Sequence, residues 1–246
     1  NIKATKNQIA NMCSILRECM EEGAWGLSTG LDYPPGAYAD TEELINLSKE
    51  AYKLDGFYHT HTRAKLITDE NILAPWDEAI EIGKKSGIPV HLTHYKQRDP
   101  GIGSYNDYLS LVENAREDGM DVTFDCYTYP YSGTTITILL PDWSKDGGPE
   151  ALMSHLKSSV SRKKMCQEIN HNAFKENWLT NFKNKYNKIF EGLSVSEIAL
   201  FKDKDPCETI FDLLIDENLG ISTVGLGNTP HSIPEFVKHP AGMIAS

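Results

Sequence analysis

Histidines at the ends of two short apolar segments are the residues whose type and spacing most directly suggest chemistry. His59 and His61 end one segment, and His91 and His94 end the next. Imidazole nitrogens bind zinc, and alternate residues of a strand face the same side, so His59 and His61 could converge on one ion. Neighbouring parallel strands would bring the second pair within reach. The residues alone leave open both a metal site and ordinary packed histidines.

Three further polar side chains follow these segments or the next one. Lys96 lies two residues after His94 and could pair with an anionic group of a substrate, or be an ordinary solvated lysine. Tyr127 and Tyr129 follow the next predicted strand and offer hydroxyl groups for hydrogen bonding, although tyrosines at strand ends are also common in packing. The remaining histidines show no spacing pattern, and we expect them at the surface: His155, His171, His231 and His239.

Alternating helix and strand patterns must position these residues. Four times, apolar residues at helical spacing end at a glycine before a short strand-like segment. The predicted helices span about 6–22, 41–54, 76–85 and 105–117, and the strands 25–29, 57–61, 88–94 and 120–125. This order is typical of parallel βα units, whose functional residues gather at the carboxyl ends of the strands.

The regular order stops after residue 126. Residues 127–204 contain irregular Gly, Ser and Thr and a Lys-rich helical stretch near 159–188; a span this long is usually a lid, a binding loop or an insertion. A helix at 206–216 and strands at 221–224 and 242–245 follow. We therefore predict three regions: βα units over 1–126, an insertion or lid over 127–204, and a last βα unit over 205–246.

Composition excludes several classes of partner. The 246 residues carry 24 Lys and Arg against 35 Asp and Glu, a formal net charge of -11, which argues against nucleic acid because phosphate binding requires a basic face. No apolar run reaches the roughly 18 to 20 residues of a membrane helix, so we expect no membrane partner. Five scattered cysteines without a CxxC pair predict free thiols in a reducing compartment, and hence a cytoplasmic protein.

Five segments carry a family resemblance. They are GLSTGLDYPPG at 26–36, YHTHTR at 58–63, VHLTHYK at 90–96, TFDCYTY at 123–129 with LLP at 139–141 and Trp143, and PAGMIAS at 240–246. Together they resemble the N-acyl-D-amino-acid deacylases, or D-aminoacylases, of the amidohydrolase superfamily, and they occur in family order over nearly the whole chain. The first segment is specific to this group, whereas the histidine segments are shared with wider amidohydrolases.

The resemblance implies the C-terminal portion, about strands 4 to 8, of an α/β fold: a (β/α)₈ barrel metallohydrolase with a long insertion after strand 7. His61 and His94 would be zinc ligands on the fifth and sixth strands, and His59 would not be a ligand. Lys96 would bind the substrate carboxylate. The further implied substrate-binding residues are Arg63, Tyr127 and Tyr129; Tyr127 is preferred, and Thr128 stands where the family usually has Pro.

The implied activity is zinc-dependent hydrolysis of the linear amide of a small-molecule substrate, an N-acyl-D-amino acid. The general-base aspartate would be the next residue after Ser246 and other ligands would precede Asn1, so we expect a fragment that is inactive alone. Two alternatives stay open: a cyclic-amide hydrolase of the hydantoinase or dihydroorotase kind, and a non-catalytic truncated barrel that acts as a binding module. Nothing in the sequence indicates the oligomeric state, the preferred side chain or the number of metal ions.

Overall fold

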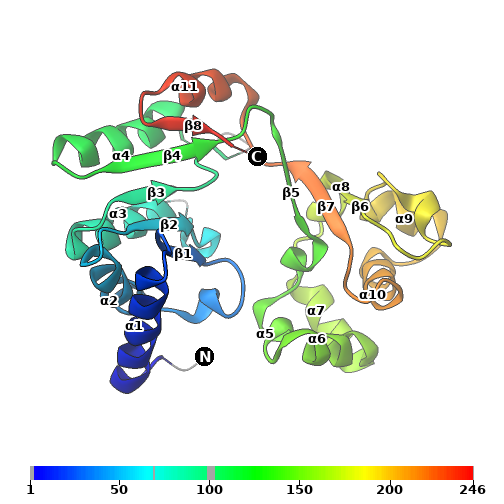
Figure 1. Cartoon of the computed structure of the whole chain (residues 1–246). Coiled ribbons are helices and arrows are strands. Elements are labelled where there is room, and N and C mark those ends of the chain that lie inside the picture. Colours follow the sequence, from blue (N-terminus) through cyan, green and yellow to red (C-terminus); the bar gives the residue numbers. More distant parts are fainter. Residues whose placement is uncertain (1–2, 69, 99–102, 246) are drawn as a thin grey trace. The chain divides into compact units, whose positions relative to one another are not determined.

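The chain divides into two compact units in a computed structural model, which describes residues 3–68, 70–98 and 103–245 (Figure 1). Unit 1 comprises Asn1–Pro130 and Asn228–Ser246, and unit 2 comprises Tyr131–Gly227. Each unit has a sheet of its own and a separate apolar core. The units are therefore described one at a time.

Unit 1 is built on a parallel sheet in the order β1-β2-β3-β4-β8. Helices α2, α3, α4 and α11 contact these strands and cover one face of the sheet, while α1 packs on α2 (Figure 1). The elements are α1 Lys6–Glu21, β1 Gly26–Gly30, α2 Thr41–Tyr52, β2 Phe57–His61, α3 Ala74–Ser86, β3 Val90–Leu92, α4 Tyr105–Glu117, β4 Val122–Cys126, α11 Ile233–Lys238 and β8 Gly242–Ile244. The α/β class and the parallel sheet agree with the sequence prediction.

Alternate residues along the strands face opposite sides of the sheet, so that one face is apolar and the other carries polar side chains. Tyr58, Leu92 and Phe124 are fully buried in the core beneath the helices. Their neighbours along the strands face the other way. Two of these neighbours, His59 in β2 and His91 in β3, are half-buried and lie on the opposite face of the sheet. The same pleat that anchors the sheet therefore presents a row of polar side chains on its other side.

Unit 2 contains an antiparallel sheet in the order β5-β7-β6, packed with short helices around its own core. Its elements are β5 Tyr131–Thr135, α5 Asp142–Lys145, α6 Gly148–Lys157, α7 Ser159–Glu168, α8 Ala173–Glu176, β6 Asn177–Thr180, α9 Val195–Phe201, α10 Pro206–Asp216 and β7 Ser222–Leu226. The helical stretch expected near 159–188 ends at Glu168, because residues 177–180 pair with β7.

The predicted boundaries 127–204 and 205–246 differ from this division. Helix α10 was predicted at its observed position, but α10 and β7 belong to unit 2. The reason is pairing: β7 bonds antiparallel to β5 and β6, whereas only β8 of the region 205–246 joins the parallel sheet beside β4. The second unit thus extends to Gly227.

The prediction of free thiols is wrong for two of the five cysteines. Cys166 and Cys207 form a disulfide in unit 2, while Cys13, Cys19 and Cys126 are free.

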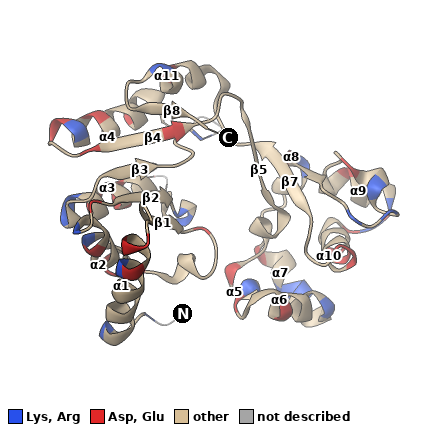
Figure 2. Cartoon of the chain, in the orientation of Figure 1, with Lys and Arg blue, Asp and Glu red and all other residues tan. Residues whose placement is uncertain are grey.

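Acidic and basic residues lie side by side on the helices (Figure 2). Among the described residues, no helix combines the length and apolar character needed to cross a bilayer.

Candidate active site

Most of the predicted site residues come together beyond the carboxyl ends of β2, β3 and β4. The rings of His61 and His94 meet edge to face with centroids 5.4 Å apart. His94 also contacts the ring of Tyr127 at 5.2 Å, and the Lys96 ammonium nitrogen lies 4.8 Å from the centre of the same ring. Tyr129 stacks on Tyr127 at 5.3 Å. These five side chains form a continuous group, called here the strand-end group.

Asp32 adds a carboxylate that the sequence analysis did not assign. Its Oδ2 lies 3.1 Å from Nε2 of His61, and its Oδ1 accepts a 2.6 Å hydrogen bond from the backbone N–H of Ala64. Asp32 stands in the loop after β1, inside the segment 26–36 that carries the family resemblance. A carboxylate held against an imidazole in this way fixes the orientation of the ring.

Asp125, at the end of β4, anchors the turn that carries His94. Its carboxylate contacts Nε2 of His91 at 3.1 Å and accepts a 2.8 Å hydrogen bond from the backbone N–H of His94. Burial opposes its ionisation, but these hydrogen bonds prevail and hold the pKa of Asp125 well below its usual range. His94 has a φ of 53°, an uncommon backbone conformation for a residue with a side chain. The anionic Asp125 therefore stabilises a strained turn that aims His94.

His59, which lies two residues before His61, takes no part in the strand-end group. His59 stacks on His91 with centroids 5.4 Å apart, and its Nδ1 lies 3.1 Å from the Ser28 hydroxyl. Burial, followed by the nearby His91, lowers the pKa of His59. Its contacts are thus with the sheet face rather than with His61 or His94.

Lys96 is half-buried, with its ammonium group over the Tyr127 ring. Burial first, and the neighbouring Arg98 charge second, lower the pKa of Lys96 to about 8. The ammonium group is thus mostly protonated at pH 7 yet partly stripped of water. A desolvated cation of this kind binds a carboxylate more strongly than an exposed lysine does.

Arg63 does not join the strand-end group. Only 6% of the residue is exposed; its Nε donates to Glu78 at 2.8 Å and its Nη1 donates to the Ala39 carbonyl at 2.8 Å. These partners lie in α3 and before α2, on the helix-covered side of unit 1. The structure therefore gives Arg63 a bridging position between elements, and the substrate contact implied for it stays a prediction.

The histidines fit a soft or borderline metal ion. His61 and His94 follow adjacent parallel strands, and Nδ1 of His94 is buried without a hydrogen-bond partner among the described atoms, its distance to Asp125 Oδ1 being 3.7 Å. A buried nitrogen without a partner is costly unless a ligand satisfies it. The aspartate expected after Ser246 lies outside the described residues.

Sequence comparison identifies deacylases as relatives. A D-aminoacylase of Alcaligenes xylosoxydans xylosoxydans is 37% identical over 134 residues, covering 54% of this chain and 27% of that protein. An N-acyl-D-glutamate deacylase of the same organism is 34% identical over 129 residues, covering 52% of this chain and 25% of that protein. The resemblance to the N-acyl-D-amino-acid deacylases is confirmed. No protein-family model matches the chain.

Solved deacylase structures share the fold. The D-aminoacylase structure described as defining a novel subset of amidohydrolases superposes with a TM-score of 0.68 at 23% identity, over 99% of this chain and 43% of that one. The N-acyl-D-glutamate deacylase of Bordetella bronchiseptica, solved with zinc and a phosphonate inhibitor, gives a TM-score of 0.72 at 21% identity, over the same shares. The chain thus spans less than half of each of these deacylases and shares their α/β architecture over nearly all its length.

Proposed function

We propose that this chain supplies the metal- and substrate-binding part of a zinc-dependent hydrolase that removes the acyl group from N-acyl-D-amino acids. One observation carries the proposal: His61 contacts His94, His94 contacts Tyr127 and Tyr127 contacts Lys96, at the strand ends of a chain related in sequence to deacylases. Imidazoles can bind a metal ion, and a phenol and a cation can bind an anionic amide substrate.

His61 and His94 would hold the zinc ion. When bound, zinc would polarise the amide carbonyl and lower the pKa of a water molecule. Asp32 keeps the His61 ring oriented through its contact with Nε2, and Asp125 holds the His94 backbone. The two carboxylates are therefore positioning residues for the two ligands.

Lys96 would bind the carboxylate of the substrate, and Tyr127 would donate a hydrogen bond from its hydroxyl. The Lys96 ammonium lies against the Tyr127 ring, so one bound substrate could touch both. Tyr129 backs Tyr127 by stacking. This arrangement orients the amide without giving Lys96 or the tyrosines a share in the proton transfers.

We further propose that the parallel sheet is part of a (β/α)₈ barrel, with β1, β2, β3, β4 and β8 as its fourth to eighth strands. The parallel register and the helices on one face support this interpretation. Unit 2 would be the insertion after the seventh strand, since it begins at Tyr131, shortly after β4. A cytoplasmic location stays a prediction, supported by three free cysteines and opposed by the Cys166–Cys207 disulfide.

A substrate panel tests this function. Because the relatives are much longer than the match, the assay uses a full-length protein that includes this chain. We expect release of free amino acid from N-acetyl-D-amino acids, at least tenfold faster than from the L-enantiomers. Preferential opening of hydantoins or dihydroorotate would support the cyclic-amide alternative instead, and no hydrolysis of any substrate by the zinc-loaded protein would support the binding-module alternative.

A further inference from the structure

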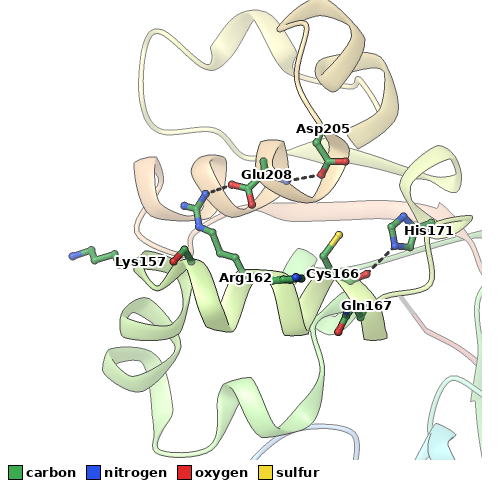
Figure 3. A pocket seen from close by; sticks show the side chains of 9 residues that line it. Lys157, Arg162, Cys166, Gln167, His171, Asp205 and Glu208 are labelled. Atoms are coloured by element: carbon green, nitrogen blue, oxygen red, sulfur yellow. Dashed lines mark hydrogen bonds and ion pairs between the residues drawn. The ribbon is translucent and has the colours of Figure 1, made fainter.

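A second cluster of potential metal ligands lies in unit 2. Cys166 and His171 line a cavity of about 730 Å³ (Figure 3). Together with the buried Cys207, each offers a ligand atom within 4.8 Å of the other two. Cys166 is near the end of α7, His171 follows that helix, and Cys207 is the second residue of α10. The Cα atoms of the two cysteines, which are bonded to each other, are 5.7 Å apart.

The orientation of His171 prepares one ring nitrogen for a ligand. Nε2 lies 2.8 Å from the backbone carbonyl of Cys166 (Figure 3), and because a carbonyl can only accept, Nε2 must carry the proton. In the neutral ring, Nδ1 then has a lone pair available. The ring also packs against Phe174 with centroids 5.4 Å apart. A histidine that donates one nitrogen to a backbone carbonyl and offers the other is typical of metal ligation.

The surroundings of the cysteines carry charges of both signs. Cys207 is buried in the first turn of α10, where the Asp205 side chain caps the helix N-terminus and accepts a hydrogen bond from the Cys207 backbone N–H. Arg162 and Lys157 line the same cavity, together with Asp205 and Glu208 (Figure 3). Arg162 is tied to Glu208 at 2.5 Å, so it contributes a fixed positive group beside a mixed lining.

We propose that the reduced chain binds a zinc ion through the Cys166 and Cys207 thiolates and Nδ1 of His171, and that the disulfide is the alternative, metal-free state. A dithiol reductant would convert the disulfide into two thiols while forming its own disulfide, and binding of Zn²⁺ would then release the two thiol protons. Two thiolates and an imidazole suit zinc rather than magnesium or calcium. Since His171 is exposed, a water molecule completes four-coordination. This site is independent of the deacylase proposal.

Cobalt serves as the probe, because Co²⁺ bound to thiolate gives an intense near-ultraviolet absorption that imidazole-only sites lack. The chain is reduced with dithiothreitol, freed of it under argon and titrated with Co²⁺ and then Zn²⁺. We expect the absorption to saturate at one equivalent of cobalt and to disappear when zinc displaces the cobalt. The oxidised chain should show no such absorption. Absence of this absorption from the reduced chain would overturn the proposal.

Variants locate the site. Cys166→Ser should abolish the cobalt–thiolate absorption, and His171→Ala, which keeps both cysteines, should weaken cobalt binding at least tenfold. Cys19→Ser is the matched control, because Cys19 is a free, exposed cysteine of unit 1, and it should bind cobalt like the parent chain. Undiminished absorption in Cys166→Ser, or unchanged affinity in His171→Ala, would contradict the assignment.

Discussion

At the residue scale, carboxylates far away in sequence hold the strand-end histidines in position. Asp32 is 29 residues from His61 and Asp125 is 31 residues from His94, yet each aspartate contacts its histidine. Strand periodicity and the family resemblance predicted His61, His94, Lys96 and Tyr127 as a group. They did not predict which carboxylate meets which ring, because that depends on loop paths and on the register between strands.

Arg63 has a buried partner that the sequence did not indicate. The family resemblance implies that Arg63 binds substrate, which stays a prediction, and its side chain pairs with Glu78 in the buried helix-facing layer. His61 and Arg63 are two residues apart, but β2 ends at His61, so the period of two no longer applies. Buried charge needs a partner, and Glu78 supplies it.

Lys96→Ala should impair substrate binding more than turnover. Removing the partly desolvated cation deletes one ion pair with the substrate carboxylate, so KM should rise about 30-fold while kcat changes less than about threefold. Steady-state kinetics on N-acetyl-D-amino acids measure both parameters. Lys84→Ala, which removes an exposed lysine paired with Asp118, is the control and should leave both unchanged. A large loss of kcat at constant KM would contradict the positioning role.

At the element scale, local signals predicted helices and strands that are bounded by clear stops. Strand β2, helix α4 and helix α10 lie at their predicted positions. Helix α10 has Asp205 as its N-cap and Pro206 in its first turn, two features visible in the sequence. The antiparallel pairing of β7 with β5 and β6 was not predicted, because strands about 45 to 90 residues apart carry no local signal of each other.

Gly26→Ala should destabilise unit 1. A Cβ at this position would lie 2.1 Å from the backbone carbonyl oxygen of Phe57 in the neighbouring strand β2, which cannot move without breaking the sheet register. We expect a loss of about 3 kcal/mol in the free energy of unfolding, the upper range for overpacking. Urea denaturation measures it. Gly30→Ala, whose Cβ would find its nearest atom 3.9 Å away, is the control in the same strand, and equal destabilisation of both variants would contradict the steric argument.

Glu217 should make the stability of unit 2 depend on pH. Its carboxylate accepts hydrogen bonds from the Lys183 backbone N–H at 2.7 Å, the Asn184 backbone N–H at 3.0 Å and the Asn187 side chain at 2.8 Å. Burial opposes ionisation, but these donors lower the pKa of Glu217 below its usual value of 4.5. A lowered pKa in the folded state means that the stabilisation is complete above about pH 4.5 and is lost as the pH falls further.

Glu217→Gln checks this account. The variant should be less stable than the parent chain by about 2 kcal/mol at pH 7, since a charged acceptor is lost. The difference should shrink below pH 4, where the parent carboxylate becomes protonated. Denaturant unfolding at several pH values measures the difference. A constant difference between pH 3 and pH 7 would show that Glu217 acts through its shape rather than its charge.

At the scale of the whole molecule, the net charge of -11 would constrain how the proposed anionic substrate is bound. An N-acyl amino acid carries a carboxylate, which the overall charge of the chain would repel. Binding of the proposed substrate would therefore rely on a local cation, and Lys96 in the strand-end group could provide one. The division into two units with separate cores places the strand-end group wholly in unit 1, and the Cys166–His171–Cys207 cluster wholly in unit 2.

Zinc retention by the strand-end group tests the central claim most directly. A full-length protein that includes this chain is loaded with Zn²⁺ without reductant, so that Cys166 and Cys207 stay bonded. It is then passed over a desalting column and assayed for zinc by atomic spectrometry. We predict that the full-length parent protein retains zinc and that its His94→Ala variant loses it. The control variant His231→Ala, which replaces an exposed histidine elsewhere in unit 1, should retain zinc. Equal zinc content in purified, folded His94→Ala and the parent protein would contradict the assignment of His94 as a ligand.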